Sequence, residues 1–176
     1  MNLENTYQAH KNLVFNLALN YVQNTEDAEE ITQDVFLSVH QSMANFKGQS
    51  DIKTWIYRIA INKSLDFLKA QKRKKRFGMI ASLFFEKSNE IKFEYSDFKH
   101  PGIILEEKEA FETLFRFINQ LPDNQKTVLL LSKIENTPQK EIAEIMGLSV
   151  KAVESLFQRA KSNIAKKYLQ TKGLVK

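Results

Sequence analysis

The chain contains no cysteine and only three histidines among its 176 residues. The absence of cysteine excludes disulfide bonds, thiolate zinc sites and cysteine nucleophiles. His10, His40 and His100 are too far apart in the sequence to indicate a metal cluster, so each is expected on the surface or on a helix face. We therefore expect neither a metal nor another cofactor.

Long apolar runs are also missing. No run approaches the roughly 20 residues needed to cross a bilayer, and the N-terminal segment MNLENTYQAHKN lacks the apolar core of a signal peptide. The sequence contains no glycine-rich phosphate loop and no evident nucleophile beside a base, which argues against an enzyme. These absences predict a cytoplasmic protein that is not inserted in a membrane and has no catalytic residue.

The basic residues are clustered in two blocks of the sequence. The net charge of the whole chain is +5. A length of 176 residues is enough for one domain or two small ones, and 43% apolar residues exclude wholesale disorder. Residues 62–76 and 151–176 each carry seven basic residues and one acidic residue, while the stretches before them are net acidic. Clustered lysine and arginine attract phosphate backbones, so two blocks indicate two contacts with nucleic acid. For either block alone, a solvated charged surface is the alternative.

The most informative stretch runs from Pro138 to Lys161. Gly147 separates two segments with helical apolar spacing, since glycine accepts the left-handed conformation common at helix ends. Thr137 is the expected cap of the first helix, and Ser149 is the expected cap of the second. Two helices joined by such a short turn match the helix-turn-helix pattern, whose second helix fits the major groove of DNA.

The second of these helices has a polar face that suits base edges and phosphates. An ordinary helix pair with a solvated polar face is the alternative, because the motif is specific only in context. The residues expected to face outward and to read DNA are Ser149, Lys151, Glu154, Ser155, Gln158, Arg159 and Lys161.

Two amphipathic helices are predicted at the N-terminus. The first ends near Asn24, and Asn24 or Thr25 caps the second. Acidic residues fill the first turns of the second helix, where carboxylates complement the helix dipole. Glu30 and Asp34 lie four residues apart, so they also present an acidic face to which a basic partner can dock.

A third helix is predicted to start at Ser50 or Asp51, after a turn containing Gly48. A stripe along it combines an aromatic residue, amide, acid and bases within about 40° on a helical wheel. Aromatic rings beside cations suit unpaired bases, which stack on rings while lysine and arginine hold the backbone. The alternative is that Trp55 and Tyr57 are core residues. The stripe residues are Trp55, Asn62, Asp66, Lys69 and Arg73.

The predicted fold is all-α, with two small helical domains joined by a flexible connector. Residues 1–76 form the N-terminal bundle, 77–104 the connector and 105–176 the helix-turn-helix domain; no segment shows convincing strand alternation. The connector is rich in phenylalanine. We expect it to collapse onto the domains of the free protein and to hide the Trp55 and Arg159 faces.

These segments, taken in order, resemble the sigma factors of bacterial RNA polymerase, specifically the extracytoplasmic-function (ECF) group of the sigma-70 family. DAEEITQDVFLSV resembles the polymerase-binding helix, and FKGQSDIKTWIYRIAINKSLDFLKAQKRKK resembles the segment that melts and reads the minus-ten promoter element. LPDNQKTVLLLSKIE followed by EIAEIMGLSVKAVESLFQRAK resembles the domain that reads the minus-thirty-five element. The resemblance implies a factor that directs core polymerase to promoters and assists DNA melting.

The resemblance also implies partners and site residues. The partners are core RNA polymerase, through its large-subunit clamp and flap, promoter DNA and an anti-sigma factor. Many family members have arginine where this chain has Glu154 and Lys69, so the promoter sequence does not follow from the family. The implied polymerase-binding residues are Asp27, Glu30, Gln33 and Asp34. The implied minus-ten residues are Lys47, Ser50, Asp51, Lys53, Trp55, Tyr57, Asn62, Lys63, Asp66, Lys69 and Arg73, and the minus-thirty-five residues are the outward-facing set given above.

Two other classes of function remain as alternatives. A conventional helix-turn-helix repressor or activator would account for the C-terminal half but leaves the segment from Trp55 to Arg76 without a purpose. A nucleic-acid enzyme would need paired carboxylates in a pocket, and Glu30 with Asp34 is the only nearby pair.

Overall fold

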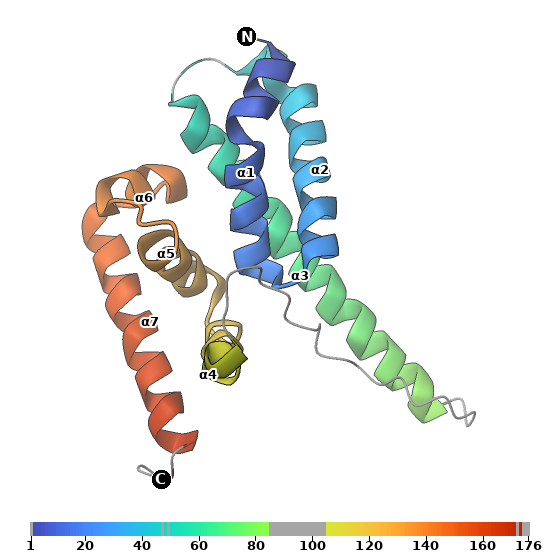
Figure 1. Cartoon of the computed structure of the whole chain (residues 1–176), viewed down its shortest axis with the longest axis vertical. Coiled ribbons are helices and arrows are strands. Elements are labelled where there is room, and N and C mark those ends of the chain that lie inside the picture. Colours follow the sequence, from blue (N-terminus) through green and yellow to red (C-terminus); the bar gives the residue numbers. More distant parts are fainter. Residues whose placement is uncertain (1, 47, 49, 85–104, 172, 174–176) are drawn as a thin grey trace. The chain divides into compact units, whose positions relative to one another are not determined.

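The computed structural model describes residues 2–46, 48, 50–84, 105–171 and 173. These residues form α-helices and one 3-10 helix, with no strand in the described ranges, which confirms the predicted all-α class (Figure 1). The elements are α1 (Leu3–Val22), α2 (Thr25–Ser42), η1 (Met43–Asn45), α3 (Ile52–Phe84), α4 (Leu105–Ile118), α5 (Asp123–Lys133), α6 (Gln139–Met146) and α7 (Val150–Thr171).

The chain divides into two units. The first contains residues Met1–Ala44 and Ile59–Lys99, and the second contains Asn45–Arg58 and His100–Lys176. The first turns of α3 therefore belong to the same unit as α4 to α7. Side chains from the first turns of α3 can therefore contact the helix-turn-helix within one unit.

In the first unit, α1 and α2 form an antiparallel pair with an apolar core. The Asn24 side chain accepts a hydrogen bond from the Asp27 backbone N–H at 2.9 Å, which confirms Asn24 as the cap of α2. Tyr7 and Phe36 meet edge to face, with ring centroids 4.8 Å apart. The large core side chains with essentially no exposed surface are Val14, Leu17, Tyr21, Ile31, Val35 and Val39.

Helix α3 begins at a local cap and runs further than the sequence suggests. The Asp51 carboxylate accepts from the Lys53 backbone N–H at 2.7 Å, so Asp51 is the cap rather than Ser50. The helix continues to Phe84 and so includes the first part of the segment expected to connect the domains. Residues 85–104, the rest of that segment, lie outside the described residues.

In the second unit, α6 and α7 form the predicted helix-turn-helix. Gly147 ends α6 with a φ of 65°, the left-handed conformation that glycine adopts without steric cost. The Ser149 hydroxyl accepts from the Ala152 backbone N–H at 3.2 Å and caps α7. Ile142 and Val153 are fully buried, which fixes the two helices to their shared core. The short turn and the apolar faces thus agree with the sequence interpretation.

The start of α6 differs from the prediction. The residue that precedes the helix is Pro138, not Thr137, and no side chain caps the helix there. Thr137 is buried, and its side chain forms a hydrogen bond with Tyr57 of α3. The expectation that Thr137 caps α6 was therefore wrong, because its hydroxyl is hydrogen-bonded to Tyr57 instead.

Candidate nucleic-acid interface

Helix α7 presents a continuous polar face. Ser149 lies directly before the helix, and the other six predicted residues lie along its first half. The buried side of the same turns includes Val153 and Ala160, so helical periodicity places the polar residues away from the core. All seven predicted side chains are exposed: Ser149, Lys151, Glu154, Ser155, Gln158, Arg159 and Lys161. We call this set the α7 face. The expectation that the connector hides Arg159 in the free protein stays a prediction, because residues 85–104 lie outside the described residues.

Two lysines extend the positive charge around Phe157 of α7. Lys133 Nζ lies 5.6 Å from the centroid of the half-buried Phe157 ring, and Lys161 Nζ lies 5.8 Å from the same centroid. Cations at this distance over a ring are attracted to its π-electron face. Lys133 comes from the last turn of α5, and the sequence analysis missed it. Its partner is 24 positions away in the chain, so no local pattern points to it.

The later part of α3 carries the predicted stripe in the first unit. Asn62, Asp66, Lys69 and Arg73 are all exposed, and Lys63 beside them is half-buried. Lys69 Nζ lies 3.7 Å from Asp66 Oδ1, a surface pair that contributes little to stability. These four residues of the stripe are therefore available to solvent, as a surface for single-stranded nucleic acid must be.

The residues at the start of α3 have mixed surroundings. Trp55 is half-buried and packs on Phe46, with ring centroids 4.8 Å apart and a tilt of 37°. Ser50 is half-buried and Asp51 is exposed, although the Asp51 carboxylate is used as the helix cap. Lys47 lies outside the described residues. The predicted minus-ten residues thus do not all share one exposed surface.

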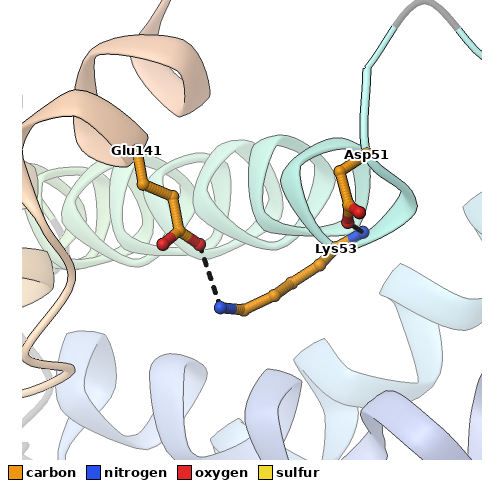
Figure 2. Close-up of polar contacts among 3 residues, drawn as sticks. All are labelled: Asp51, Lys53 and Glu141. Atoms are coloured by element: carbon orange, nitrogen blue, oxygen red, sulfur yellow. Dashed lines mark hydrogen bonds and ion pairs between the residues drawn. The ribbon is translucent and has the colours of Figure 1, made fainter.

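Lys53 and Tyr57 face the helix-turn-helix within the second unit. Lys53 Nζ lies 2.9 Å from Glu141 Oε1 of α6 (Figure 2). Tyr57 is only 3% exposed, and its burial, together with Glu135 and Glu141, raises its pKa to about 12. The hydrogen bond with Thr137 opposes this rise. The tyrosine is therefore a neutral phenol at physiological pH.

Arg58, which the sequence analysis did not select, joins the same contact. Its Nη2 donates to the Glu144 carbonyl oxygen at 2.6 Å, and its Nε donates to the Ile145 carbonyl oxygen at 3.0 Å. These are among the last carbonyls of α6, where a helix leaves acceptors over, and the Glu144 carbonyl also accepts from the Gly147 backbone N–H at 3.3 Å. Arg58 thus completes the C-terminus of a helix that lies far away in the sequence, and its positive charge complements the negative end of the helix dipole.

The predicted acidic face lies on α2. Glu30, Gln33 and Asp34 are exposed, while Asp27 is half-buried in the first turn. Burial raises the pKa of Asp27, and the neighbouring Glu30 and Glu26 raise it further. Carboxylates that lie this close together repel one another, which favours contact with a cation.

An exposed leucine extends this acidic face. Leu37 is 58% exposed and follows Asp34 by three positions, so the two side chains are neighbours on the helix surface. The sequence analysis missed it, although a signal was present: Leu37 falls outside the apolar stripe that faces α1. We use the term α2 face for Asp27, Glu30, Gln33, Asp34 and Leu37.

The structure gives no indication of other kinds of site within its described part. No cluster of three or more histidine, cysteine or acidic residues there could hold a metal ion. No helix among the described residues is long and apolar enough to cross a membrane.

The chain is similar to known proteins over almost its whole length. Residues 6–74 match the family model for sigma-70 region 2, and residues 111–164 match that for sigma-70 region 4. It is 30% identical over 158 residues to the ECF RNA polymerase sigma-E factor of Haemophilus influenzae, a match covering 90% of this chain and 82% of the relative. The chain belongs to the ECF sigma factors of the sigma-70 family.

Other similarities agree with this assignment. The sigma factor is 29% identical over 160 residues to the RNA polymerase sigma-H factor of Pseudomonas aeruginosa, covering 89% of this chain and 81% of that protein. Its fold is similar to that of the sigma factor RpoE, solved with the anti-sigma factor NepR from Bartonella quintana. The TM-score is 0.61 at 16% identity, over 93% of this chain and 94% of that one.

The family assignment establishes the function in outline. The protein is a promoter-directing sigma factor, and the alternative of a conventional repressor is not favoured. Sigma-70 proteins are transcription initiation factors rather than enzymes. The region 2 match contains the α2 face and the α3 stripe, and the region 4 match contains the α7 face up to its last residue.

Proposed function

We propose that the α7 face of this sigma factor reads the minus-thirty-five element as duplex DNA. The supporting observation is that all seven side chains of this face are exposed on one helix, directly after the Gly147 turn. A helix with such a face fits the major groove, where arginine and glutamine recognise base edges and lysine contacts phosphates. Glu154 is exposed as well, and it would accept a hydrogen bond from a cytosine amino group.

The α3 residues are proposed to hold the opened minus-ten strand. The exposed stripe from Asn62 to Arg73 provides amides and cations, and Trp55 provides an aromatic ring at the start of the same helix. Unpaired bases stack on aromatic rings while cations hold the backbone. The remaining members of the proposed set are Lys47, Ser50, Asp51, Lys53, Tyr57 and Lys63.

The α2 face is proposed to bind the clamp of the large polymerase subunit. Burial and then the neighbouring Glu30 and Glu26 raise the pKa of Asp27, and a basic partner surface would relieve the repulsion among these carboxylates. Leu37 offers exposed apolar area at the end of the acidic residues, and protein interfaces combine apolar area with charged residues at their rim.

Charge reversal tests the polymerase contact. Glu30→Lys combined with Asp34→Lys is expected to abolish co-purification with core polymerase, while leaving the far-ultraviolet circular dichroism unchanged, because both side chains are exposed. A matched control is Glu4→Lys combined with Glu29→Lys, two exposed acids outside the α2 face with the same change in net charge. Normal co-purification of the first variant would remove this face from the mechanism.

The DNA-binding roles are tested by transcription with purified core polymerase on a pool of genomic fragments. The proposal predicts initiation at a limited set of promoters that share two sequence elements. If the protein instead bound one operator unaided as a dimer, it would act as a repressor or activator.

We also propose an anti-sigma partner and a cytoplasmic location. The support for the partner is that RpoE, which has a similar fold, was solved with an anti-sigma factor. The support for the location is that the proposed partner is core polymerase, which works on chromosomal DNA in the cytoplasm. The proposed reaction requires no cofactor or catalytic residue from this chain, because polymerase supplies the chemistry.

A further inference from the structure

We infer that helix α6 is a releasable cover over the start of α3, and that it hides Lys53 and Tyr57 from the promoter strand they are proposed to contact. This inference rests on the proposed role of these two residues in minus-ten recognition. It concerns contacts within the second unit alone, which contains both the first turns of α3 and α6.

Three links of different chemistry form the cover. The first is the ion pair between Lys53 and Glu141, at 2.9 Å (Figure 2). The second is the hydrogen bond between the side chains of Tyr57 and Thr137, beside the start of α6. The third is Arg58, which donates to the Glu144 and Ile145 carbonyls at 2.6 and 3.0 Å. The links thus engage the segment just before α6, the first turn of α6 and its C-terminal end.

The cover occupies the side chains that a DNA strand would need. Lys53 Nζ is paired with Glu141 and also lies 5.6 Å from the centroid of the Tyr57 ring, so its charge is already satisfied. Tyr57 is 3% exposed, which leaves no ring surface on which a base could stack. A base can reach the Tyr57 ring only after the residues around it move, and a phosphate can pair with Lys53 only by competing with Glu141.

The chemistry of the contact makes it releasable. The Lys53 and Glu141 side chains are 42% and 29% exposed, so water and salt weaken their attraction. Phosphates of a DNA strand would compete for both Lys53 and Arg58, because they can replace the carboxylate and carbonyl oxygens as hydrogen-bond acceptors. The expected releasing partner is therefore the backbone of single-stranded DNA.

The first arm of the test measures the cover itself, without DNA. The chain has no cysteine, so Lys53→Cys and Glu141→Cys introduce the only two thiols. A short bismaleimide is expected to link them within one molecule of the free full-length protein, and the single-cysteine variants control for links between molecules. Absence of the internal link would overturn the cover whatever the residues do on DNA.

The second arm measures competition with DNA. Glu141→Gln breaks the ion pair without altering any residue of the proposed strand-binding set. It is expected to tighten binding of a fluorescein-labelled mixed-sequence single strand by about two- to five-fold, the size expected for a partly exposed pair. Glu144→Gln is the matched control: it removes the same charge from an exposed position of α6 and leaves the Glu144 backbone carbonyl for Arg58.

The two arms separate the possible failures. An internal link together with tighter binding only for Glu141→Gln supports the cover. Equal binding by the two glutamine variants would overturn the competition, even if the link forms. If the link forms and no variant binds the strand at all, the proposed minus-ten role of α3 fails and the competition inference fails with it, whereas the contact between α3 and α6 stands.

Discussion

The two candidate DNA-binding surfaces in the second unit differ in their accessibility. The α7 face is exposed along its whole length, whereas Lys53, Tyr57 and Arg58 at the start of α3 are engaged by α6. Duplex DNA has its groove open before the protein arrives, so a preformed face suits it. A separated strand exists only after the promoter has melted, so a surface that becomes accessible at that stage suits single-stranded DNA.

The same helix serves both surfaces. Helix α6 packs beneath α7 through Ile142, and it contacts α3 through Glu141 and its last carbonyls. A change in its core therefore affects both surfaces, whereas a change in an exposed residue affects only one. The predictions below use this distinction and run from the largest expected effect to the smallest.

The largest effect is expected for Ile142→Ala. Ile142 is fully buried, and an isoleucine-to-alanine change in a core typically lowers the free energy of unfolding by about 2–5 kcal/mol. The shift of the denaturation midpoint, followed by circular dichroism, measures this loss. Ile134→Ala is the matched control, because Ile134 is 38% exposed and its loss should cost much less. Equal shifts for both variants would show that α6 is not anchored by its core.

A smaller and more selective effect is expected for Arg159→Ala. Arg159 is exposed, so the free energy of unfolding should stay within about 0.5 kcal/mol of the original value. Promoter binding by the holoenzyme should weaken by about 1–3 kcal/mol if the guanidinium contacts a base. Electrophoretic mobility shift measures this loss, and Arg159→Lys tests whether charge alone suffices. Unchanged binding by the alanine variant would remove Arg159 from the α7 face.

The smallest effect concerns the ionisation of Tyr57. Its pKa is raised from 10.0 to about 12, so the folded protein holds this proton more tightly than the unfolded chain does. The resulting stability is fully present below about pH 10 and is lost as the pH rises through about 12. Tyrosinate absorbance should show one late-titrating group, which disappears in Tyr57→Phe. The same variant loses the hydrogen bond with Thr137, at a cost of about 1 kcal/mol.

A titration of Tyr57→Phe that keeps the late-titrating group would show that another tyrosine produces it. The protein has five tyrosines, so the difference between the original protein and the variant is the informative quantity.

Local sequence signals placed most of the helices correctly. Asn24, Asp51 and Ser149 each accept from a backbone N–H two or three residues later, and Gly147 adopts the left-handed conformation that ends α6. These features are readable from the sequence because each cap and its partner are close in the chain. The outward direction of the α7 face was equally readable, because it follows from helical periodicity alone.

Local signals failed where a side chain has a distant partner. The Thr137 hydroxyl bonds to Tyr57 instead of capping α6, and Lys133 lies over Phe157. Arg58 reaches carbonyls that are 86 and 87 positions away. No spacing rule relates positions so far apart, so these contacts were found only in the structure.

The sequence by itself determined the all-α class, the helix-turn-helix and the sigma-factor family, because caps, apolar periodicity and motif order all lie along the chain. The tertiary structure decided which of the predicted DNA-contacting residues are accessible. The start of α3 carries Lys53 and Tyr57 in a pattern that suits nucleic acid, yet Lys53 is paired with Glu141 of α6, and Tyr57 is buried and hydrogen-bonded to Thr137 just before that helix. Whether a side chain is accessible depends on the elements that pack around it. That packing is long-range, so the local sequence pattern of a residue does not reveal it.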